Sequence, residues 1–183
     1  MDNKVYINLK KNLEGKLLQR CYKNYGYISN IYKILEYNDG EIEAENLKAS
    51  AIFEISFSCK LCRPLLKTQI VCKIERVNKL LLTATNGPIH VIVTNDRMSD
   101  SFFTDHNNIL RYKKDGVSKI LNPKDFVKIT LLSITFSHND TVIKSIGQLE
   151  DVASTEEITK FYNDEYGVDM DHVEFEDYIK NAE

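Results

Sequence analysis

The sequence predicts an α+β fold that is mostly β, and three observations support this prediction. Residues 53–61 alternate strictly between apolar and polar side chains, which is the pattern of a half-buried strand. Five further apolar runs lie between residues 69 and 149, with turn residues between neighbouring runs. A capping motif and an acidic segment follow them, which indicates a helix rather than another strand.

The charge divides the chain into a mildly basic body and an acidic tail. Residues 151–183 contain eleven Asp or Glu and two Lys, a net charge of −9, so residues 1–150 carry +6 of the total of −3. Basic bodies attract phosphate backbones, whereas acidic tails stay solvated or dock on basic partners. Together with a break at Pro64, this predicts an N-terminal domain at 1–64, a barrel at 65–152 and an acidic tail at 153–183 that is partly helical or disordered.

Neither a membrane span nor a secretion signal is predicted. The apolar runs are far shorter than the roughly 20 residues that cross a bilayer, and MDNKVYINLKKN at residues 1–12 lacks the apolar core of a signal peptide. We therefore expect a soluble intracellular protein whose four Cys are reduced. The frequent Lys, Asn and Ile indicate an AT-rich genome.

The first 40 residues predict strands more than helices. Residues 4–9, KVYINL, predict a short strand, and the Lys-rich link after them has room for a helical turn or two. Residues 24–37 place Ile at spacings that would suit a helix, but their Tyr and Ile content and the flanking Gly favour a strand. The sequence NDG at 38–40 predicts a turn, because Asn and Asp tolerate a positive φ and Gly adopts it freely.

The stretch SCKLCRP at residues 58–64 contains a Cys-x-x-Cys pair, which raises the alternatives of a metal site and a redox pair. Cys59 falls on the apolar face of the strand at 53–61, whereas Cys62 would point to the opposite face. A structural zinc site needs two further ligands, but the other two Cys stand alone and the four His are scattered. A redox pair needs a following helix N-terminus, which the sequence lacks. We interpret the pair as the end of a strand and expect no metal.

Five strand-like runs predict a five-stranded barrel of the OB type, a fold that binds oligonucleotides in many proteins. NGP at 86–88 and SHND at 137–140 supply turns. Residues 95–125 are too polar and irregular for a core, so we expect a long connection between the third and fourth strands. The five runs are residues 69–77, 79–85, 89–94, 126–137 and 141–149.

The acidic tail begins with a helix signal. Ser154 and Glu157 have the spacing of a capping box, which predicts a helix through residues 156–166 that Gly167 ends. Residues 169–183 mix carboxylates with aromatic and aliphatic side chains. A metal site is one interpretation of these carboxylates, but the charge pattern favours a solvated helix face and a docking tail.

The sequence gives little support for catalysis. Residues 1–150 lack the clustered Asp that Mg²⁺ chemistry needs. The chain has no phosphate loop, nucleophile elbow or His-Glu-x-x-His motif, and seven Gly leave little for a phosphate cradle. We therefore expect a non-catalytic protein without a cofactor.

Nucleic-acid binding has more support, because basic and aromatic residues occur together in the predicted barrel. Phe102 and Phe103 could stack on bases, or they could instead pin the long connection onto the barrel. A solvated surface is the common alternative for the basic residues. With a charge of only +6, we expect weak, sequence-independent contact with RNA. The RNA-contacting candidates are Lys73, Arg76, Lys79, His90, Arg97, Phe102 and Phe103, and Arg111, Lys113 and Lys114 lie nearby in the sequence.

Protein–protein contact is the best supported role. Five Tyr fall within sixteen residues of the small N-terminal domain, and Tyr is enriched at interface hot spots. Some of these rings are expected in the core, and those at the turn flanking Gly26 are expected on the surface. The five are Tyr22, Tyr25, Tyr27, Tyr32 and Tyr37.

Several motifs, in this order and spacing, resemble the seventh, stalk-forming subunit of multisubunit DNA-dependent RNA polymerases, a family with eukaryotic and archaeal members. The resemblance covers residues 4–152. It rests on Tyr25-Gly26-Tyr27 ahead of a strand, Arg63-Pro64 between two domains, Gly87-Pro88 before the strand at 89–94, and Ile146-Gly147 ahead of Glu150 and Asp151.

The resemblance implies a non-catalytic stalk subunit that supports initiation and handles nascent RNA. Residues 1–64 would form a tip domain, a small antiparallel sheet with a short helix. Its loops would contact the clamp region of the largest subunit and a sixth-subunit-like protein, and a fourth-subunit-like stalk partner is usual in the family. The barrel would lie beside the RNA exit path and touch the transcript weakly. The implied core-docking residues are Tyr25, Gly26, Tyr27, Asn46 and Lys48.

The sequence also departs from the family pattern. Lys79-Leu80 stand where the family has a Gly-aromatic pair, and Leu offers no stacking face for a base. The N-terminal helix is expected to be shortened, and the acidic tail lies outside the usual pattern. A divergent, AT-rich copy indicates a large DNA virus, with the protein in the virion and the host cytoplasm; the nucleus and a protist source are alternatives. The rival function is a free-standing OB-fold RNA-binding protein that resembles a translation factor.

Overall fold

The chain forms two compact units in the computed structural model, which describes residues 3–42, 50–78, 80–104, 109–114 and 116–166. Of these residues, 3–20 and those between 28 and 62 form one unit, called here the N-terminal unit. Residues 21–27 and 63–166 form the other, called the barrel unit. The short hairpin at 21–27 therefore belongs with the barrel, although it lies far from it in the sequence.

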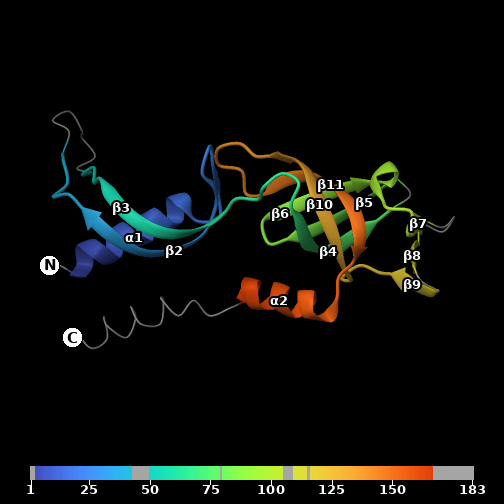
Figure 1. Ribbon diagram of the computed structural model, residues 1–183. Coiled ribbons are helices and arrows are strands. Elements are labelled where there is room, and N and C mark those ends of the chain that lie inside the picture. Colours follow the sequence, from blue (N-terminus) through green and yellow to red (C-terminus); the bar gives the residue numbers. More distant parts are fainter. Residues whose placement is uncertain (1–2, 43–49, 79, 105–108, 115, 167–183) are drawn as a thin grey trace. The chain divides into compact units, whose positions relative to one another are not determined.

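Helix α1 (Asn3–Leu17) and strands β2 (Gly26–Tyr37) and β3 (Ile55–Cys62) make up most of the N-terminal unit. In Figure 1, α1 runs along β2, and the backbone N–H of Ile34 donates to Tyr6 Oη at 3.4 Å. Strand β2 is the middle strand of a three-stranded sheet in the order β1-β2-β3, where β1 is Cys21–Tyr22. The buried apolar side chains of this unit include Leu9, Ile28, Ile31 and Ile34.

The strand predicted at residues 4–9 is wrong, because these residues lie in α1, a helix of 15 residues. The expectation that this helix is shorter than in the family stays a prediction. The alternation of Val5, Ile7 and Leu9 suggested a strand only when the stretch was considered alone. Apolar spacing continues from Leu9 to Leu13 and Leu17, four residues at a time, which is the period of a helix. Ile7 is 57% exposed whereas Leu9 is 8% exposed, as expected for different faces of a helix.

The strand expected at 24–37 and the turn at 38–40 are confirmed. Asn30 Oδ1 accepts the N–H of Ile31 at the point where strict alternation of buried residues along β2 is interrupted. In the turn, Gly40 has a φ of +79°, and Asn38 Oδ1 accepts the N–H groups of Gly40 and Glu54 at 3.3 and 3.1 Å. The Asn side chain therefore ties the two arms of the connection together.

The Cys-x-x-Cys pair lies at the end of β3, as predicted, with both thiols free. Cys62 lies three positions after Cys59 on the strand, so the two side chains leave opposite faces. Burial raises the pKa of both thiols, which favours the protonated form rather than the thiolate that binds metal or attacks disulfides.

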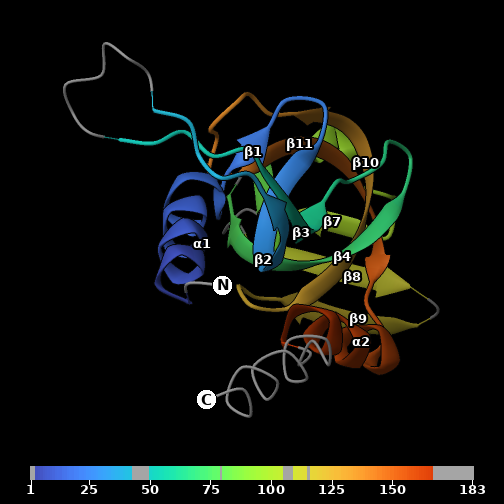
Figure 2. The same ribbon diagram turned by 90° about the vertical axis from the view of Figure 1, so that its left-hand side faces the viewer.

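Five strands close into a barrel in the order β10-β11-β6-β5-β4, which confirms the predicted OB-type barrel. Figure 2 gives a second view of the barrel unit. Strand β6 pairs with β11 in parallel, and the other neighbours pair antiparallel. The strands are β4 (Gln69–Val77), β5 (Leu81–Asn86), β6 (Ile89–Thr94), β10 (Phe126–Thr135) and β11 (Ile143–Val152).

Two glycines explain how the barrel turns and closes. Gly87, with a φ of +52°, and Pro88 form the two-residue loop between the paired Asn86 and Ile89, as in a type II′ hairpin. At Gly147 a Cβ atom would collide with the side chain of Ile129 and would lie 2.8 Å from Val91 Cγ1. The barrel interior at this level therefore has room for glycine only.

Residues 95–125 connect the third and fourth barrel strands, as predicted, but the expected irregularity is wrong, because the connection holds a small antiparallel sheet in the order β7-β8-β9. This inserted sheet comprises β7 (Phe102–Thr104), β8 (Leu110–Lys114) and β9 (Val117–Leu121), and the 3₁₀ turn η1 (Asn95–Arg97) precedes it. Phe102, Leu110 and Leu121 are at most 6% exposed. Because each strand buries only one or two side chains, the apolar pattern was too dilute to detect.

Helix α2 (Thr155–Tyr166) packs on the barrel through an aromatic cluster. The centroids of the Phe161 and Tyr162 rings lie 5.2 and 5.6 Å from that of Phe126. The predicted capping box is present, since Ser154 N donates to Glu157 Oε2 at 2.8 Å and Glu157 N donates to Ser154 Oγ at 3.3 Å. Gly167 and the rest of the predicted tail lie outside the described residues. Neither α1 nor α2, the two α-helices described, combines the length and apolarity that crossing a bilayer requires.

We predict that Gly147→Ala lowers the free energy of unfolding by about 1–3 kcal/mol, because the added methyl group overpacks the barrel interior. Urea denaturation followed by circular dichroism measures this change. Gly15→Ala is the matched control, because a Cβ there meets nothing within 4 Å and Ala favours the helix. Equal stability of the two variants would contradict the packing argument.

Candidate nucleic-acid interface and docking turn

A row of polar side chains, called here the cation row, crosses four barrel strands. Lys73 on β4 lies opposite Thr85, and Thr85 lies opposite His90 on β6. His90 in turn lies opposite Lys144 on β11. Both sequence neighbours of each basic residue point inward and are at most 5% exposed, so the three basic side chains point outward. With strands about 4.8 Å apart, the row extends over about 14 Å of surface.

A second row on the same outer face is more apolar. Arg76 lies opposite Thr83, Thr83 opposite Ile92, and Ile92 opposite Ile146. The two Ile side chains are 43% and 40% exposed. The outer face of the central barrel strands therefore combines cations with a small apolar area. The corresponding face of OB folds binds oligonucleotides and oligosaccharides.

Sequence reasoning identified three members of this face, Lys73, Arg76 and His90, but missed Lys144. The last strand follows the third by about fifty residues, and only the parallel pairing of β6 with β11 brings Lys144 beside His90. A topology argument could have found it, because OB-type barrels place the fifth strand next to the third. Lys79, another candidate, lies outside the described residues.

The remaining RNA candidates are not on this face. Arg97 lies in η1 and its side chain approaches Asp96 at 3.9 Å. Phe102 is 6% exposed and its ring centroid lies 5.1 Å from that of Tyr112, so it packs inside the inserted sheet, as the pinning alternative supposed. Phe103 is 45% exposed and lies opposite Arg111 on the other face of that sheet.

Three of the five predicted docking residues, Tyr25, Gly26 and Tyr27, lie in or beside a sharp hairpin turn. Cys21 pairs with Tyr27 and Tyr22 with Gly26, which leaves residues 23–25 as the loop. Gly26 has a φ of +125°, a conformation that L side chains rarely adopt. Tyr25 is 67% exposed, whereas Tyr27 is half-buried. Asn46 and Lys48, the other two docking candidates, lie outside the described residues.

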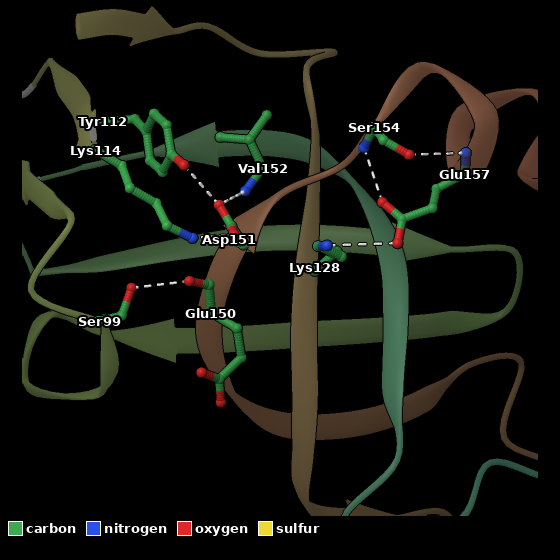
Figure 3. A network of polar contacts seen from close by, with 9 residues as sticks. All are labelled: Ser99, Tyr112, Lys114, Lys128, Glu150, Asp151, Val152, Ser154 and Glu157. Carbon is green, nitrogen blue, oxygen red and sulfur yellow. Dashed lines mark hydrogen bonds and ion pairs between the residues drawn. The ribbon is translucent and has the colours of Figure 1, made fainter. Parts of the chain in front are cut away.

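The inserted sheet is fastened to the end of β11 by Asp151 (Figure 3). Tyr112 Oη donates to Asp151 Oδ1 at 2.7 Å, and Lys114 Nζ donates to Asp151 Oδ2 at 2.7 Å. Next to this contact, Ser99 Oγ donates to the carbonyl oxygen of Glu150 at 2.9 Å. Asp151, through its carboxylate, and Glu150, through its backbone carbonyl group, thus help to position the insertion.

These donors change the titration of Asp151. Burial alone would raise its pKa, but hydrogen bonds from Lys114, Tyr112 and the N–H of Val152, together with the Lys114 charge, lower the pKa to about 2. A carboxylate with a depressed pKa stabilises the fold above its ordinary pKa near 4. This stabilisation disappears as the pH falls through about 2.

The described residues do not bring together three His, Cys, Asp or Glu side chains that could hold a metal ion. Cys72, in the barrel core, is fully buried, and burial raises the pKa of its thiol to about 12.

We predict that Asp151→Asn lowers the free energy of unfolding at pH 7 by about 1 kcal/mol, a modest loss because solvent screens the half-exposed Lys114. The difference from the wild type should stay constant from pH 7 to about pH 5 and shrink as the pH falls towards 2. Urea titrations at several pH values measure it, with the exposed Asp100→Asn as control. A difference that persists at pH 2 would rule out the charge as its source.

Comparison with known proteins identifies the family to which the chain belongs. No protein-family model matches it. The chain is 31% identical over 158 residues to a protein of Acanthamoeba polyphaga mimivirus described as "Putative DNA-directed RNA polymerase subunit L376". The match covers 86% of this chain and 77% of the mimivirus protein, so it extends through both compact units. The chain therefore belongs to the family of DNA-directed RNA polymerase subunits that includes this mimivirus protein.

Proposed function

We propose that this protein is the non-catalytic stalk subunit of a multisubunit DNA-directed RNA polymerase, where it supports initiation and handles nascent RNA. The observation that carries the proposal is the combination of an OB-type barrel with an exposed Tyr turn in a chain that matches a polymerase subunit along most of its length. A stalk subunit needs a part that docks on the polymerase and a part that reaches the transcript.

The docking role is supported by the surfaces of the two units, each considered alone. In the barrel unit, the Tyr25 ring is 67% exposed at the tip of a rigid hairpin. In the N-terminal unit, several large apolar side chains on different elements are also more than 40% exposed, which is typical of protein interfaces. These are Ile7, Leu35, Ile42, Ile52 and Leu61.

The partners that we propose are the clamp region of the largest polymerase subunit and a sixth-subunit-like protein, with a fourth-subunit-like stalk partner as a further candidate. The similar mimivirus protein is viral, which supports the expectation of a viral polymerase. We propose that this polymerase works in the host cytoplasm and is carried in the particle. A free-standing OB-fold RNA-binding protein, which is the alternative function, would not need an exposed Tyr turn for docking on a polymerase.

The RNA role is supported by the cation row. Three basic side chains on neighbouring strands can follow a phosphate backbone, and the adjacent Ile92 and Ile146 offer a small apolar contact for bases. The described part of this face carries no Phe, Tyr or Trp side chain for stacking. Contact with RNA is therefore electrostatic, weak and independent of sequence.

We predict that Tyr25→Ala weakens binding to the polymerase at least tenfold without changing the melting temperature, because the exposed ring contributes to an interface and little to the fold. Affinity purification of the tagged full chain from its native source, followed by quantification of the largest polymerase subunits, measures the association. Phe103→Ala removes another exposed ring as a control. If the wild-type chain does not co-purify with polymerase subunits, the free-standing alternative replaces the stalk proposal.

We predict that Lys73→Ala combined with Lys144→Ala lowers the affinity for single-stranded RNA and reduces the slope of log K against log salt by about 1.4, because two phosphate contacts are lost. Filter binding or fluorescence anisotropy with oligo-uridine at several salt concentrations measures both quantities. Lys11→Ala on α1 removes an exposed charge outside the barrel as a control. An unchanged slope in the double variant would exclude the cation row as the RNA surface.

A further inference from the structure

Backbone hydrogen bonds join the hairpin at residues 21–27 to the turn that connects β10 and β11. Cys21 N donates to the carbonyl oxygen of Asp140 at 2.7 Å, and Asn139 N donates to the carbonyl oxygen of Cys21 at 2.8 Å. Cys21 is thus bonded to the turn through both its N–H and its carbonyl group. Both segments belong to the barrel unit, and Figures 1 and 2 show them side by side.

Side chains also hold the hairpin at 21–27 against the turn that connects β10 and β11. Cys21 is fully buried, and its thiol lies 3.8 Å from the carbonyl oxygen of Val142, to which it donates. The ring of Tyr22 meets that of His138 edge to face, with centroids 5.0 Å apart and an interplanar angle of 82°. The hairpin is therefore held by backbone, thiol and ring contacts to the same turn.

The turn at 137–140 is rigid in its own right. Asp140 Oδ2 accepts the N–H of Ser137 at 2.7 Å, and Asp140 N donates to the carbonyl oxygen of Ser137 at 3.2 Å. Asn139 adopts a φ of +68°, which Asn tolerates better than most residues. His138 and Asn139 remain exposed on its outer side, as Lys23 and Asn24 do on the hairpin loop.

This arrangement bears on what the barrel can bind. In OB folds the loop between the fourth and fifth strands is one of the loops that contact nucleic acid. Here that loop is the turn at 137–140, and it is bonded to the hairpin that presents Tyr25. The loop is thus tied to a protein-docking element, which favours a protein ligand over a strand of RNA at this end of the barrel.

We propose that the hairpin loop at 23–25 and the turn at 137–140 form one composite docking surface for an acidic patch on a polymerase core subunit, contacted by Lys23, Tyr25 and His138. The proposal rests on the proposed function and deepens it by adding a barrel loop to the docking site. The acidic character of the partner follows from charge complementarity: Lys23 is exposed, and the Asp140 carboxylate is already engaged by Ser137. A partner with a recess for the Tyr25 ring beside a carboxylate fits this surface.

The test compares His138→Ala and Lys23→Ala with the wild type in binding to polymerase purified without this subunit, using the full chain. Each variant should weaken binding at least fivefold, leave the affinity for oligo-uridine unchanged, and keep the wild-type melting temperature. Lys124→Ala is the matched control, because Lys124 is an exposed cation on another turn of the barrel unit, also at positive φ. The control should bind the polymerase as the wild type does.

Photo-crosslinking makes the test independent of the folding of His138→Ala. A photoreactive amino acid placed at position 138 should capture the same polymerase subunit as one placed at position 23. The composite surface is overturned if position 138 captures no polymerase subunit, or if His138→Ala binds the polymerase normally, or if it weakens RNA binding instead. Tyr25→Ala separates the two hypotheses: if it weakens docking while His138→Ala does not, the stalk proposal survives and the composite surface fails.

Discussion

Closure of the barrel through the parallel pairing of β6 with β11 is the constraint on which the surfaces of this protein depend. A Cβ atom at position 147 of β11 would collide with the Ile129 side chain and lie 2.8 Å from Val91 Cγ1 on β6, so Gly147 lets β11 pack closely against its neighbours in the barrel. The same pairing sets Lys144 beside His90, and Ile146 beside Ile92, on the outside. One packing requirement in the interior therefore fixes the composition of the outer face, and a change of register by one residue would exchange the two sets of side chains.

A second consequence concerns the two ends of β11, which hold different additions to the barrel. At its beginning, the turn at 137–140 binds the hairpin at 21–27 through backbone bonds that do not depend on side-chain chemistry. At its end, Asp151 binds the inserted sheet through charged and phenolic donors. The first attachment combines peptide groups with the buried thiol of Cys21 and the ring contact between Tyr22 and His138. The second depends on the ionisation of a carboxylate whose pKa is lowered to about 2, so the inserted sheet keeps this contact throughout the physiological range.

The sequence predicted the barrel well because its strands alternate strongly and are bounded by turn residues with clear conformational preferences, such as Gly87-Pro88. The capping box of α2 and the strand end at Cys62 could be predicted for the same local reasons. Helix α1 was missed because its first six residues alternate like a strand, and only packing of Leu9 and contact of Tyr6 with β2 decide the outcome. The partners of Cys21 and Asp151, and the position of Lys144, arise from pairings between distant segments, which local patterns do not contain.

The positions of the exposed aromatic rings in the barrel unit indicate which of its surfaces suits contact with protein and which suits contact with RNA. Stacking on an aromatic ring contributes about 1–3 kcal/mol per base, and in OB folds the central strands and the two flanking loops supply such platforms. On the described part of this face the exposed apolar side chains are Ile92 and Ile146, and the β4–β5 loop presents Leu80, which is 74% exposed. Aliphatic side chains can cover a base but cannot stack on it as an aromatic ring does, so the RNA contact that we propose depends mainly on the Lys charges and weakens as salt is added. The most exposed aromatic ring of the described residues, Tyr25, lies instead on the hairpin that the barrel holds in place, where a protein partner can enclose it. The barrel unit thus combines an OB scaffold whose described outer face has no exposed Phe, Tyr or Trp with an exposed Tyr ring on the attached hairpin.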